Sequence, residues 1–313
     1  MNHRFKLHLD QILIKVERTV LKAHIFLLIV ALIYGANYSI AKLVLNDGYI
    51  APNGFILIRA GLGFVLFFLF HRFIVQERVE RKDIPLIAIC GLFGVAINQL
   101  CFFNGLKLTS SVHASLIMLT SPMLVLIASS ILLKEKITGI RIIGFIIGAT
   151  GAALLILNRS NASAGEASIG GDLLILANAS SYAIYLVIVK RLMKKYNPLT
   201  IVKWVFFFGF LYVIPFGFNE FIQIQVRAFT TQIWLAVAFV IFGTTFLAYL
   251  LNAKALTLVN PTVVSAYIYL QPLVATIIAI LFSSYRLEGT TILSAFLISI
   301  GLYLSAFFTY QKK

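Results

Sequence analysis

The chain has 313 residues, of which 60% are hydrophobic and 12% are charged, and its formal net charge is +15 at pH 7. Soluble domains carry about 25% charged residues, so this composition excludes a water-soluble domain. The long apolar runs also exclude a disordered chain and a basic nucleic-acid-binding protein. We therefore expect an integral membrane protein whose partner is the lipid bilayer, with no nucleic acid partner.

Residues 1–22 precede the first long apolar run and carry several basic residues. Apolar residues from Phe5 to Val20 fall at helical spacing, with Lys and Arg between them. Two interpretations fit this pattern: a short amphipathic helix lying on an anionic membrane surface, or a solvated tail. Because no small-residue cleavage site follows the first apolar run, we expect no cleavable signal peptide.

The rest of the chain divides into apolar stretches close to the roughly 20 residues that a helix needs to cross a bilayer. Loops with Asn, Asp, Gly, Pro or Lys separate them, and the strict alternation of a transmembrane β-barrel is absent. We predict an all-α integral membrane protein with ten transmembrane helices. They cover residues 23–45, 54–71, 84–106, 112–133, 138–157, 172–193, 201–218, 231–253, 261–283 and 290–310.

The distribution of basic residues sets the expected orientation. If both termini are cytoplasmic, as an even number of spans allows, most Lys and Arg fall in cytoplasmic segments, among them 72–82 and 190–203. The opposite loops hold Lys107, Arg159, Arg227 and Arg286. Because cytoplasmic loops are enriched in Lys and Arg, the sequence predicts a protein of the inner membrane with both termini in the cytoplasm.

The chain also contains an internal repeat. Segment 106–122 aligns with 256–272 at a constant offset of 150 residues, and Tyr34 aligns with Tyr182 at an offset of 148. Each half holds five predicted spans, and because five is odd the second half has to cross the membrane in the opposite sense. Inverted repeats are typical of transporters that expose one site to each side in turn. The expected domains are an N-terminal cytoplasmic segment, 1–22, and two five-helix repeats, 23–158 and 172–310.

An ordered set of short motifs accompanies this duplication. They are Tyr34-Gly35-Ala36-Asn37-Tyr38, Arg59 after Pro52, Leu106-Lys107-Leu108-Thr109-Ser110, Thr120-Ser121-Pro122, Leu132-Leu133-Lys134-Glu135 and Leu270-Gln271-Pro272. Through them the chain resembles, over nearly its whole length, the ten-helix EamA-type members of the drug/metabolite transporter superfamily. The resemblance implies export of amino acids and other small metabolites. Two positions depart from the pattern: His113 stands where Asn is common, and Tyr285 where Glu is usual.

Polar side chains inside the predicted spans are the candidate binding residues, because a polar group that faces lipid without a partner is costly. Tyr182 and Tyr185 are three residues apart, and Tyr267 and Gln271 four apart, so each pair is expected to share a helix face. The alternatives are interhelical hydrogen bonds for the amides and an interfacial aromatic belt for the tyrosines. The predicted substrate-binding residues are Asn37, Arg59, Gln99, Tyr182, Tyr185, Tyr249, Asn252, Tyr267, Tyr269 and Gln271.

Three further features of the spans have two interpretations each. Arg59 binds a substrate carboxylate, or its long side chain reaches the membrane surface. Pro122 and Pro272 lie close to the middle of equivalent spans, where proline bends a helix, and we predict that they are gating hinges; static kinks are the alternative. Gly144 and Gly148 form a GxxxG pair, which packs helices within one chain or forms a dimer face.

Charged groups near the spans suggest how transport is driven. No Asp or Glu lies near the middle of a predicted span, so we expect a facilitator or an exchanger, or weak proton coupling through His113. With no acid near Arg59, the site is expected to favour zwitterionic or anionic substrates. Lys42 and Lys190 lie near opposite faces and are expected to extend to the membrane surface.

Together these features predict a secondary transporter, an exporter that moves small metabolites such as amino acids across the inner membrane by alternating access. No phosphate-binding loop, hydrolase elbow or metal-ligand spacing is present, so we expect no ATP, cofactor or metal site. The alternative function is that of a membrane-embedded transferase, which needs clustered catalytic residues, commonly His with Asp or Glu. The sequence shows no such cluster, and it leaves the oligomeric state open.

Overall fold

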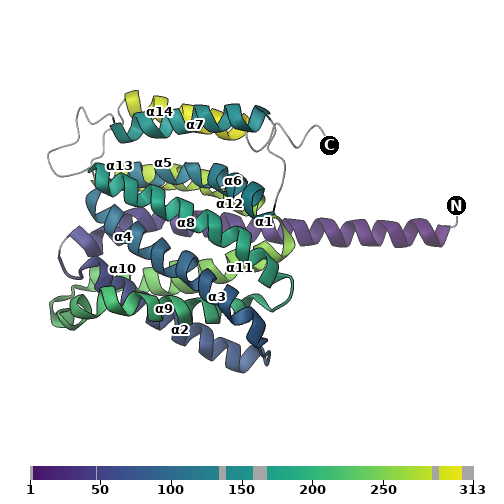
Figure 1. The fold of residues 1–313 in the computed structure, drawn as a ribbon, viewed down its shortest axis with the longest axis horizontal. Coiled ribbons are helices and arrows are strands. Elements are labelled where there is room, and N and C mark those ends of the chain that lie inside the picture. The colour runs from purple at the N-terminus through teal and green to yellow at the C-terminus, as the bar shows by residue number, and fades with distance from the viewer. Residues whose placement is uncertain (1–2, 47, 134–138, 158–167, 284–288, 305–313) are drawn as a thin grey trace.

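A computed structural model describes residues 3–46, 48–133, 139–157, 168–283 and 289–304. Within these ranges the chain folds into helices and contains no β-strand, as the hydropathy pattern predicts (Figure 1). The first half consists of α1 (His3–Asn46), α2 (Pro52–Ile74), η1 (Arg81–Asp83), α3 (Ile84–Gly91), η2 (Leu92–Ala96), α4 (Ile97–Leu108), α5 (Ser111–Ile117), η3 (Met118–Thr120), α6 (Ser121–Leu133) and α7 (Gly139–Leu157).

The second half repeats this order element by element. It consists of α8 (Ile169–Met193), α9 (Pro198–Ile222), η4 (Val226–Ala228), α10 (Thr231–Ala238), η5 (Phe239–Leu247), α11 (Ala248–Leu258), α12 (Pro261–Ala266), η6 (Tyr267–Leu270), α13 (Gln271–Ser283) and α14 (Gly289–Leu302). In both halves a π-helical segment precedes the fourth α-helix: η2 precedes α4, and η5 precedes α11. In both, a 3₁₀ turn, η3 or η6, interrupts the next span. The repeat found in the sequence therefore extends to the irregular parts of its helices.

Seven stretches of helix in the described chain are long and apolar enough to cross a bilayer. Each corresponds to one predicted span. They are Leu21–Leu45, Pro52–Ile74, Arg81–Leu108, Ser111–Leu132, Ile169–Met193, Pro198–Ile222 and Thr231–Leu258. Shorter apolar helices occupy the three remaining predicted positions, at Ile142–Gly151, Val263–Ile278 and Ile292–Gly301. The all-helical prediction is confirmed, and seven spans meet the length of a bilayer crossing.

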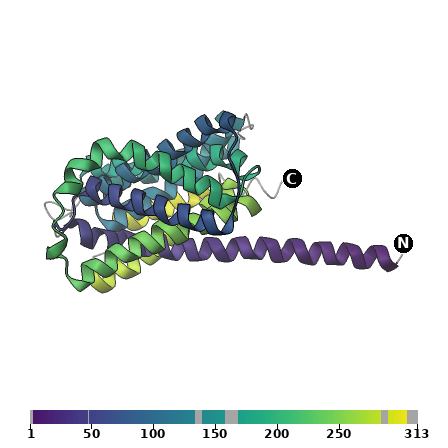
Figure 2. The same cartoon turned by 90° about the horizontal axis from the view of Figure 1, so that it is seen from below.

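Helix α1 continues well beyond its apolar part. It begins at His3 and runs without a break to Asn46, so its N-terminal portion projects from the body of the protein (Figures 1 and 2). The predicted boundary at residue 22 marks the start of the apolar run, which begins at Leu21, and not a break in the helix.

The two halves pack against each other in matched pairs. Helix α1 contacts α11 and α13 of the second half, and its equivalent α8 contacts α4 and α6 of the first. The equivalent helices α2 and α9 contact each other directly, as do α7 and α14, which lie side by side at one edge of the molecule (Figure 1). Neither half therefore buries its apolar faces without the other.

Glycines allow the closest of these contacts. A Cβ atom added to Gly301 of α14 would lie 2.5 Å from the carbonyl oxygen of Gly144 on α7. Real Cβ atoms do not approach backbone so closely, so glycine is required there. The Gly144 and Gly148 stripe thus packs two helices of the same chain, which is the first of its two sequence interpretations.

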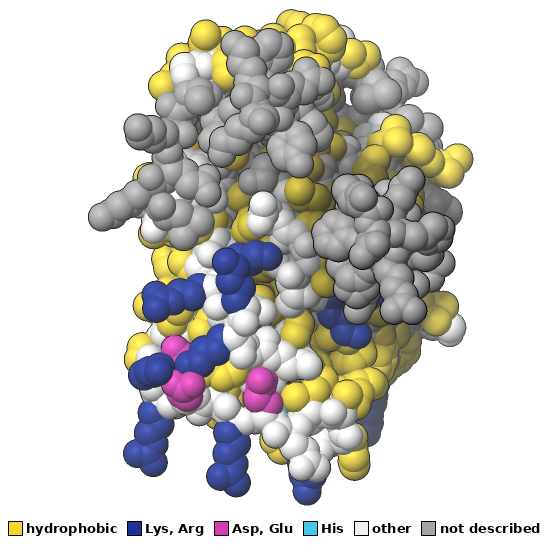
Figure 3. Space-filling model, turned by 90° about the vertical axis from the view of Figure 1, so that its right-hand side faces the viewer, with side chains coloured by type: hydrophobic (Ala, Val, Ile, Leu, Met, Phe, Trp, Pro, Cys, Tyr) yellow, Lys and Arg dark blue, Asp and Glu magenta, His cyan; other side chains and the backbone are white. Residues whose placement is uncertain are grey.

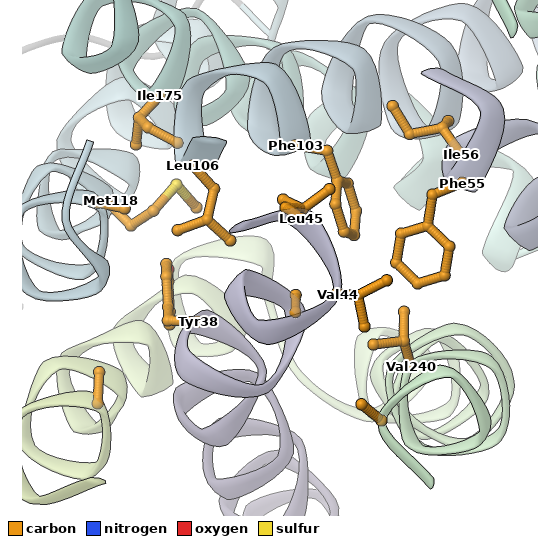
Figure 4. Packing of buried hydrophobic residues seen from close by; sticks show 14 of the residues in the cluster. Tyr38, Val44, Leu45, Phe55, Ile56, Phe103, Leu106, Met118, Ile175 and Val240 are labelled. Carbon is orange, nitrogen blue, oxygen red and sulfur yellow. The ribbon is translucent and has the colours of Figure 1, made fainter. Parts of the chain in front are cut away.

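Large apolar side chains fill the space between the helices. Figure 4 shows Tyr38 of α1, Phe55 of α2, Phe103 and Leu106 of α4 and other buried residues from both halves meeting in one cluster. Many other large apolar residues are exposed on the outside, among them Phe73 of α2. An exposed apolar surface of this extent marks contact with lipid or protein.

Basic side chains gather at the end of the molecule toward which α1 projects (Figure 3). At this end Lys195, in the turn between α8 and α9, bonds to Glu80 Oε1 at 2.7 Å and to Asp83 Oδ2 at 2.6 Å. Hydrogen bonds from Lys195 hold the pKa of Glu80 below its usual value, and the bonds to Asp83 and Glu80 raise the pKa of Lys195. Two of the basic segments predicted to share a side of the membrane are thus joined.

Candidate functional site

A cavity with about 710 Å³ of empty space, part of it open to the surroundings, lies between the two halves. Helices α1, α2, α4, α8 and α11 line it, together with η3 of the broken span in the first half and with α12, η6 and α13 of the broken span in the second half. Among the described residues its lining contains many polar side chains but no carboxylate. The polar lining residues are Tyr34, Asn37, Tyr38, Arg59, Asn98, Gln99, Asn178, Tyr182, Tyr249, Asn252, Tyr267 and Gln271.

Arg59 on α2 points inward and does not extend to the membrane surface. It is 4% exposed, its Nε donates to Thr245 Oγ1 at 2.5 Å, and its guanidinium lies 5.0 Å from the ring centre of Phe103. Thr245 can accept this bond because its own hydroxyl proton is donated to the Val240 carbonyl. No carboxylate in the described part of the chain forms an ion pair with Arg59. The cavity therefore contains a fixed, uncompensated positive charge.

Tyr249 lies where the two halves meet in the cavity. Its hydroxyl donates to the carbonyl of Gly94 at 3.0 Å and accepts from Gln99 Nε2 at 3.4 Å. Gln99 and Tyr249 are 150 residues apart, so this contact joins equivalent positions of the two repeats. Both side chains follow a π-helical segment, and π segments are frequent at functional sites.

Further hydrogen bonds order the tyrosines around the cavity. Asn252 Nδ2 donates to the Tyr182 hydroxyl at 2.7 Å, and the Tyr38 hydroxyl donates to Gln271 Oε1 at 3.1 Å. The Tyr267 hydroxyl lies 2.6 Å from His24 Nδ1. The rings thus line the cavity in defined positions.

Two predicted site residues, Tyr185 and Tyr269, do not line this cavity. Tyr185 lies three residues after Tyr182, which turns it by about 60° around an α-helix, and its ring packs directly on Gly94. Tyr269 follows Tyr267 by two residues in a 3₁₀ turn, which rotates it by about 120°. Its hydroxyl is buried without a hydrogen bond partner. The spacing of the tyrosines in the sequence was therefore not enough to predict which of their side chains line the cavity.

Four polar lining residues, Tyr34, Tyr38, Asn98 and Asn178, were missed by the sequence prediction. Tyr34 could have been found from its alignment with Tyr182, but Tyr38 gives no such signal. Asn98 and Asn178 each donate to the backbone carbonyl of the other, at 3.5 and 2.7 Å. They make interhelical bonds, as lone amides in spans commonly do, and they line the cavity as well.

The two predicted hinge prolines occupy equivalent positions at helix breaks. Pro122 is the second residue of α6, directly after η3, and Pro272 is the second residue of α13, directly after η6. Proline fits the first turn of a helix, where its missing N–H has no intrahelical partner. The cavity is lined by Met118 of the first break and by Tyr267 of the second. The prolines thus mark where two spans change direction beside the cavity, and hinge motion at them stays a prediction.

Asp172, expected at a helix end, is in the first turn of α8 but is buried, with 1% exposure. Its Oδ1 accepts from Thr109 Oγ1 at 2.5 Å, and its Oδ2 lies 3.9 Å from His113 Nδ1. Neither Oδ2 nor Nδ1 has a hydrogen bond partner. The fold therefore brings His113 and Asp172 together outside the cavity, although they are far apart in the sequence and form no sequence motif.

In this protein, apolar helices enclose a polar cavity with a buried cation. This arrangement is typical of integral membrane proteins that bind a solute within the bilayer. The sequence model of the EamA-like transporter family matches residues 21–157 and 169–307. The chain belongs to the EamA-like transporter family, within the drug/metabolite transporter superfamily, and is an integral membrane transporter rather than an enzyme. The two matched stretches coincide with the two halves of the fold.

Named relatives agree with this assignment. The chain is 28% identical over 263 residues to the uncharacterized transporter YyaM of Bacillus subtilis, covering 83% of this chain and 85% of that protein. It is 23% identical over 211 residues to a probable terminal-alkyne amino-acid exporter of Streptantibioticus cattleyicolor, covering 65% of this chain and 66% of that protein. A solved crystal structure shares the fold, with a TM-score of 0.61 at 17% identity over 90% of this chain and 98% of that one.

Proposed function

We propose that the protein is a secondary transporter that exports small metabolites, such as amino acids, across the inner membrane by alternating access. The observation that carries the proposal is Arg59, a buried cation in a central cavity whose described lining residues include no carboxylate. A buried charge is costly unless it is paired, so this cavity favours a substrate that brings a negative group. Zwitterions and anions meet that requirement. The name of the Streptantibioticus relative, an amino-acid exporter, supports the same class.

The proposed architecture is ten transmembrane helices in two inverted five-helix repeats. The repeated order of π segments and 3₁₀ breaks supports it, and so does the reciprocal packing of α1 and α8 on the opposite half. The broken spans at Pro122 and Pro272 would act as hinges, opening the cavity to one side or the other. The ion pairs of Lys195 join two basic segments at one end, and because cytoplasmic loops are enriched in Lys and Arg, this end is the proposed cytoplasmic side.

The driving force is a separate part of the proposal. We propose facilitated diffusion or exchange, because no carboxylate that could carry a proton lines the cavity in the part of the chain that the structure describes. The buried Asp172 and the partly buried His113 lie outside the cavity and form the one acid–imidazole pair in the described chain. Uphill accumulation driven by a pH gradient, and lost in His113→Asn, would contradict facilitated transport and assign coupling to that pair.

The proposal is tested by counterflow in proteoliposomes against a panel of amino acids, organic acids and amines. We expect exchange of amino acids or organic acids but not of simple amines, and loss of that exchange in Arg59→Met. Arg227→Met, which alters an exposed arginine in η4, is the matched control and is expected to behave as the wild type. Equal exchange by Arg59→Met, or exchange of amines alone, would contradict the proposal.

A further inference from the structure

We infer that the cavity recognises both ends of a zwitterion, with Arg59 binding its carboxylate and the side-chain amide oxygens of Asn37, Gln99 and Asn178 binding its ammonium group. The inference rests on the proposed function, since it assigns the substrate class to the same cavity. It adds three specificity-determining residues and separates amino acids from plain organic anions.

The three amide oxygens share one unusual property. Asn37, Gln99 and Asn178 are 4%, 1% and 2% exposed, and the side-chain oxygen of each has no hydrogen bond partner. All three residues line the cavity, and they come from three different helices, α1, α4 and α8. Buried polar atoms are nearly always hydrogen-bonded, so three unpartnered acceptors around one cavity indicate a ligand that donates.

Neighbouring groups fix which end of two of these amides is free. Asn178 Nδ2 donates to the Asn98 carbonyl at 2.7 Å, so turning the amide over would set its oxygen against another acceptor. Gln99 Nε2 donates to the Tyr249 hydroxyl, whose own proton is donated to Gly94. Turning Gln99 over would again bring two acceptors together. The oxygen is therefore the free atom in both side chains.

The chemistry of the lining distinguishes ammonium from other donors. An ammonium group has three N–H donors and a positive charge, which suits several neutral carbonyl oxygens. The guanidinium of Arg59 matches a carboxylate in shape and charge. A simple amine would bring a second positive charge near Arg59, and a plain carboxylate would leave the three oxygens unpartnered. A zwitterion satisfies both groups.

The apolar part of the lining indicates the substrate side chain. Leu27, Val30, Phe102, Met118 and Ile268 complete the cavity wall beside the tyrosines. These side chains favour an apolar group by excluding water from it. L-Phenylalanine is therefore a suitable probe, with 3-phenylpropionate as the analogue that lacks the ammonium and 2-phenylethylamine as the analogue that lacks the carboxylate.

The test is calorimetric binding of the three probes to the purified full chain in lipid nanodiscs. We expect L-phenylalanine to bind at least about tenfold more tightly than either analogue. Asn37→Leu should weaken L-phenylalanine about tenfold and leave 3-phenylpropionate unchanged, because it removes an ammonium acceptor and keeps Arg59. Asn37→Asp should shift the preference toward 2-phenylethylamine, since it adds a negative charge. Asn197→Asp, at the exposed N-cap of α9, is the control and should leave the affinities for all three probes unchanged.

Three results would overturn the inference. They are equal affinity for L-phenylalanine and 3-phenylpropionate, an equal loss of both in Asn37→Leu, and no binding of any probe. In the first two cases Arg59 alone binds an anion, and the counterflow measurement can still succeed. In the third, counterflow against the wider panel decides separately whether the protein is a transporter. Failure of zwitterion recognition is thus distinguishable from failure of the proposed function.

Discussion

Lys42 and Lys190 make the same contact in the two halves of the protein. Lys42 Nζ donates to the carbonyl of Thr109 and Lys190 Nζ to that of Val259, each at 2.7 Å. Thr109 and Val259 are the C-cap residues of the equivalent helices α4 and α11. Both ammonium groups thus satisfy carbonyls at the negative end of a helix dipole, at the ends of spans.

The first prediction concerns these lysines. Lys42→Met and Lys190→Met should each lower the free energy of unfolding by about 1–2 kcal/mol, because each leaves helix-terminal carbonyls without a donor. Thermal unfolding in detergent measures the effect. Lys194→Met, at an exposed position at the end of α8, is the control and should change little. Melting temperatures equal to the wild type for both cap variants would contradict the role.

The second prediction tests how Arg59 is held. Thr245→Val removes the acceptor of the Arg59 Nε bond and should lower the transport rate roughly tenfold with little change in stability, because the guanidinium loses its fixed position. Thr244→Val is a close control, since Thr244 is equally buried and bonds to the same Val240 carbonyl without touching Arg59. Initial rates of counterflow compare the two. Similar losses in both variants would show that Thr245 has no specific role.

The third prediction separates Tyr182 from Tyr185. Tyr182→Phe removes a hydroxyl that lines the cavity and orders Asn252, so transport or its KM should change several-fold. Tyr185→Phe alters a ring outside the lining and should leave both parameters near wild type. Counterflow over a range of substrate concentrations distinguishes them. A larger effect for Tyr185 would contradict the location of the site.

The fourth prediction concerns the contact of α7 with α14. Gly301→Ala places a Cβ atom against the backbone of Gly144 and Gly148 and should destabilise the protein by about 1–3 kcal/mol. Gly289→Ala, in the first turn of α14, meets no atom within 4 Å and should be neutral or slightly stabilising. Chemical denaturation in detergent compares the pair. If these helices pack between chains instead, Gly301→Ala should dissociate an oligomer without lowering the stability of the monomer.

The fifth prediction concerns pH and the Lys195 contacts. The pKa of Glu80 is lowered by its hydrogen bond from Lys195, so the stabilisation is present above the unfolded pKa near 4.3 and is lost as pH falls below it. The pKa of Lys195 is raised, so the contact also persists until the pH exceeds its unfolded value near 10.4. Hydrogen exchange of the Glu80 amide, which donates to the Tyr196 hydroxyl at 3.2 Å, should therefore be slow from pH 5 to 9, after correction for its intrinsic pH dependence. Lys195→Met should accelerate it at every pH in that range.

The sequence predicted the helical class, the positions of the spans and most of the cavity lining. These predictions agree with the structure because hydropathy, and the cost of placing a polar group in lipid, can be assessed from the local sequence alone. Eight of the ten predicted binding residues line the cavity, the exceptions being Tyr185 and Tyr269. Tyr185 is turned about 60° away from Tyr182 around the regular helix α8, and Tyr269 lies in a 3₁₀ turn that the residue pattern does not predict.

Tertiary contacts account for the other differences. Asp172 lies near a helix end, in agreement with the sequence, but the sequence did not predict its burial or its contacts with Thr109 and His113. Lys42 and Lys190 reach carbonyls that are 67 and 69 residues away in the chain. Separations of this kind cannot be inferred from a single sequence, because they depend on how the two halves interlock.

The contact between Gln99 and Tyr249 has a particular consequence for how such a protein could move. Suppose that during transport each half adopts the conformation that the other half had. Each contact between two residues is then replaced by the contact between the equivalent residues. Gln99 and Tyr249 are equivalent to each other, so their contact is replaced by itself. It can therefore persist in both states and act as a pivot. The bond from Tyr38 to Gln271 has no such property, because the equivalent positions hold Leu186 and Ser121. This bond can therefore form in only one of the two states of the transporter. It would lower the free energy of the state that opens to one side relative to the state that opens to the other.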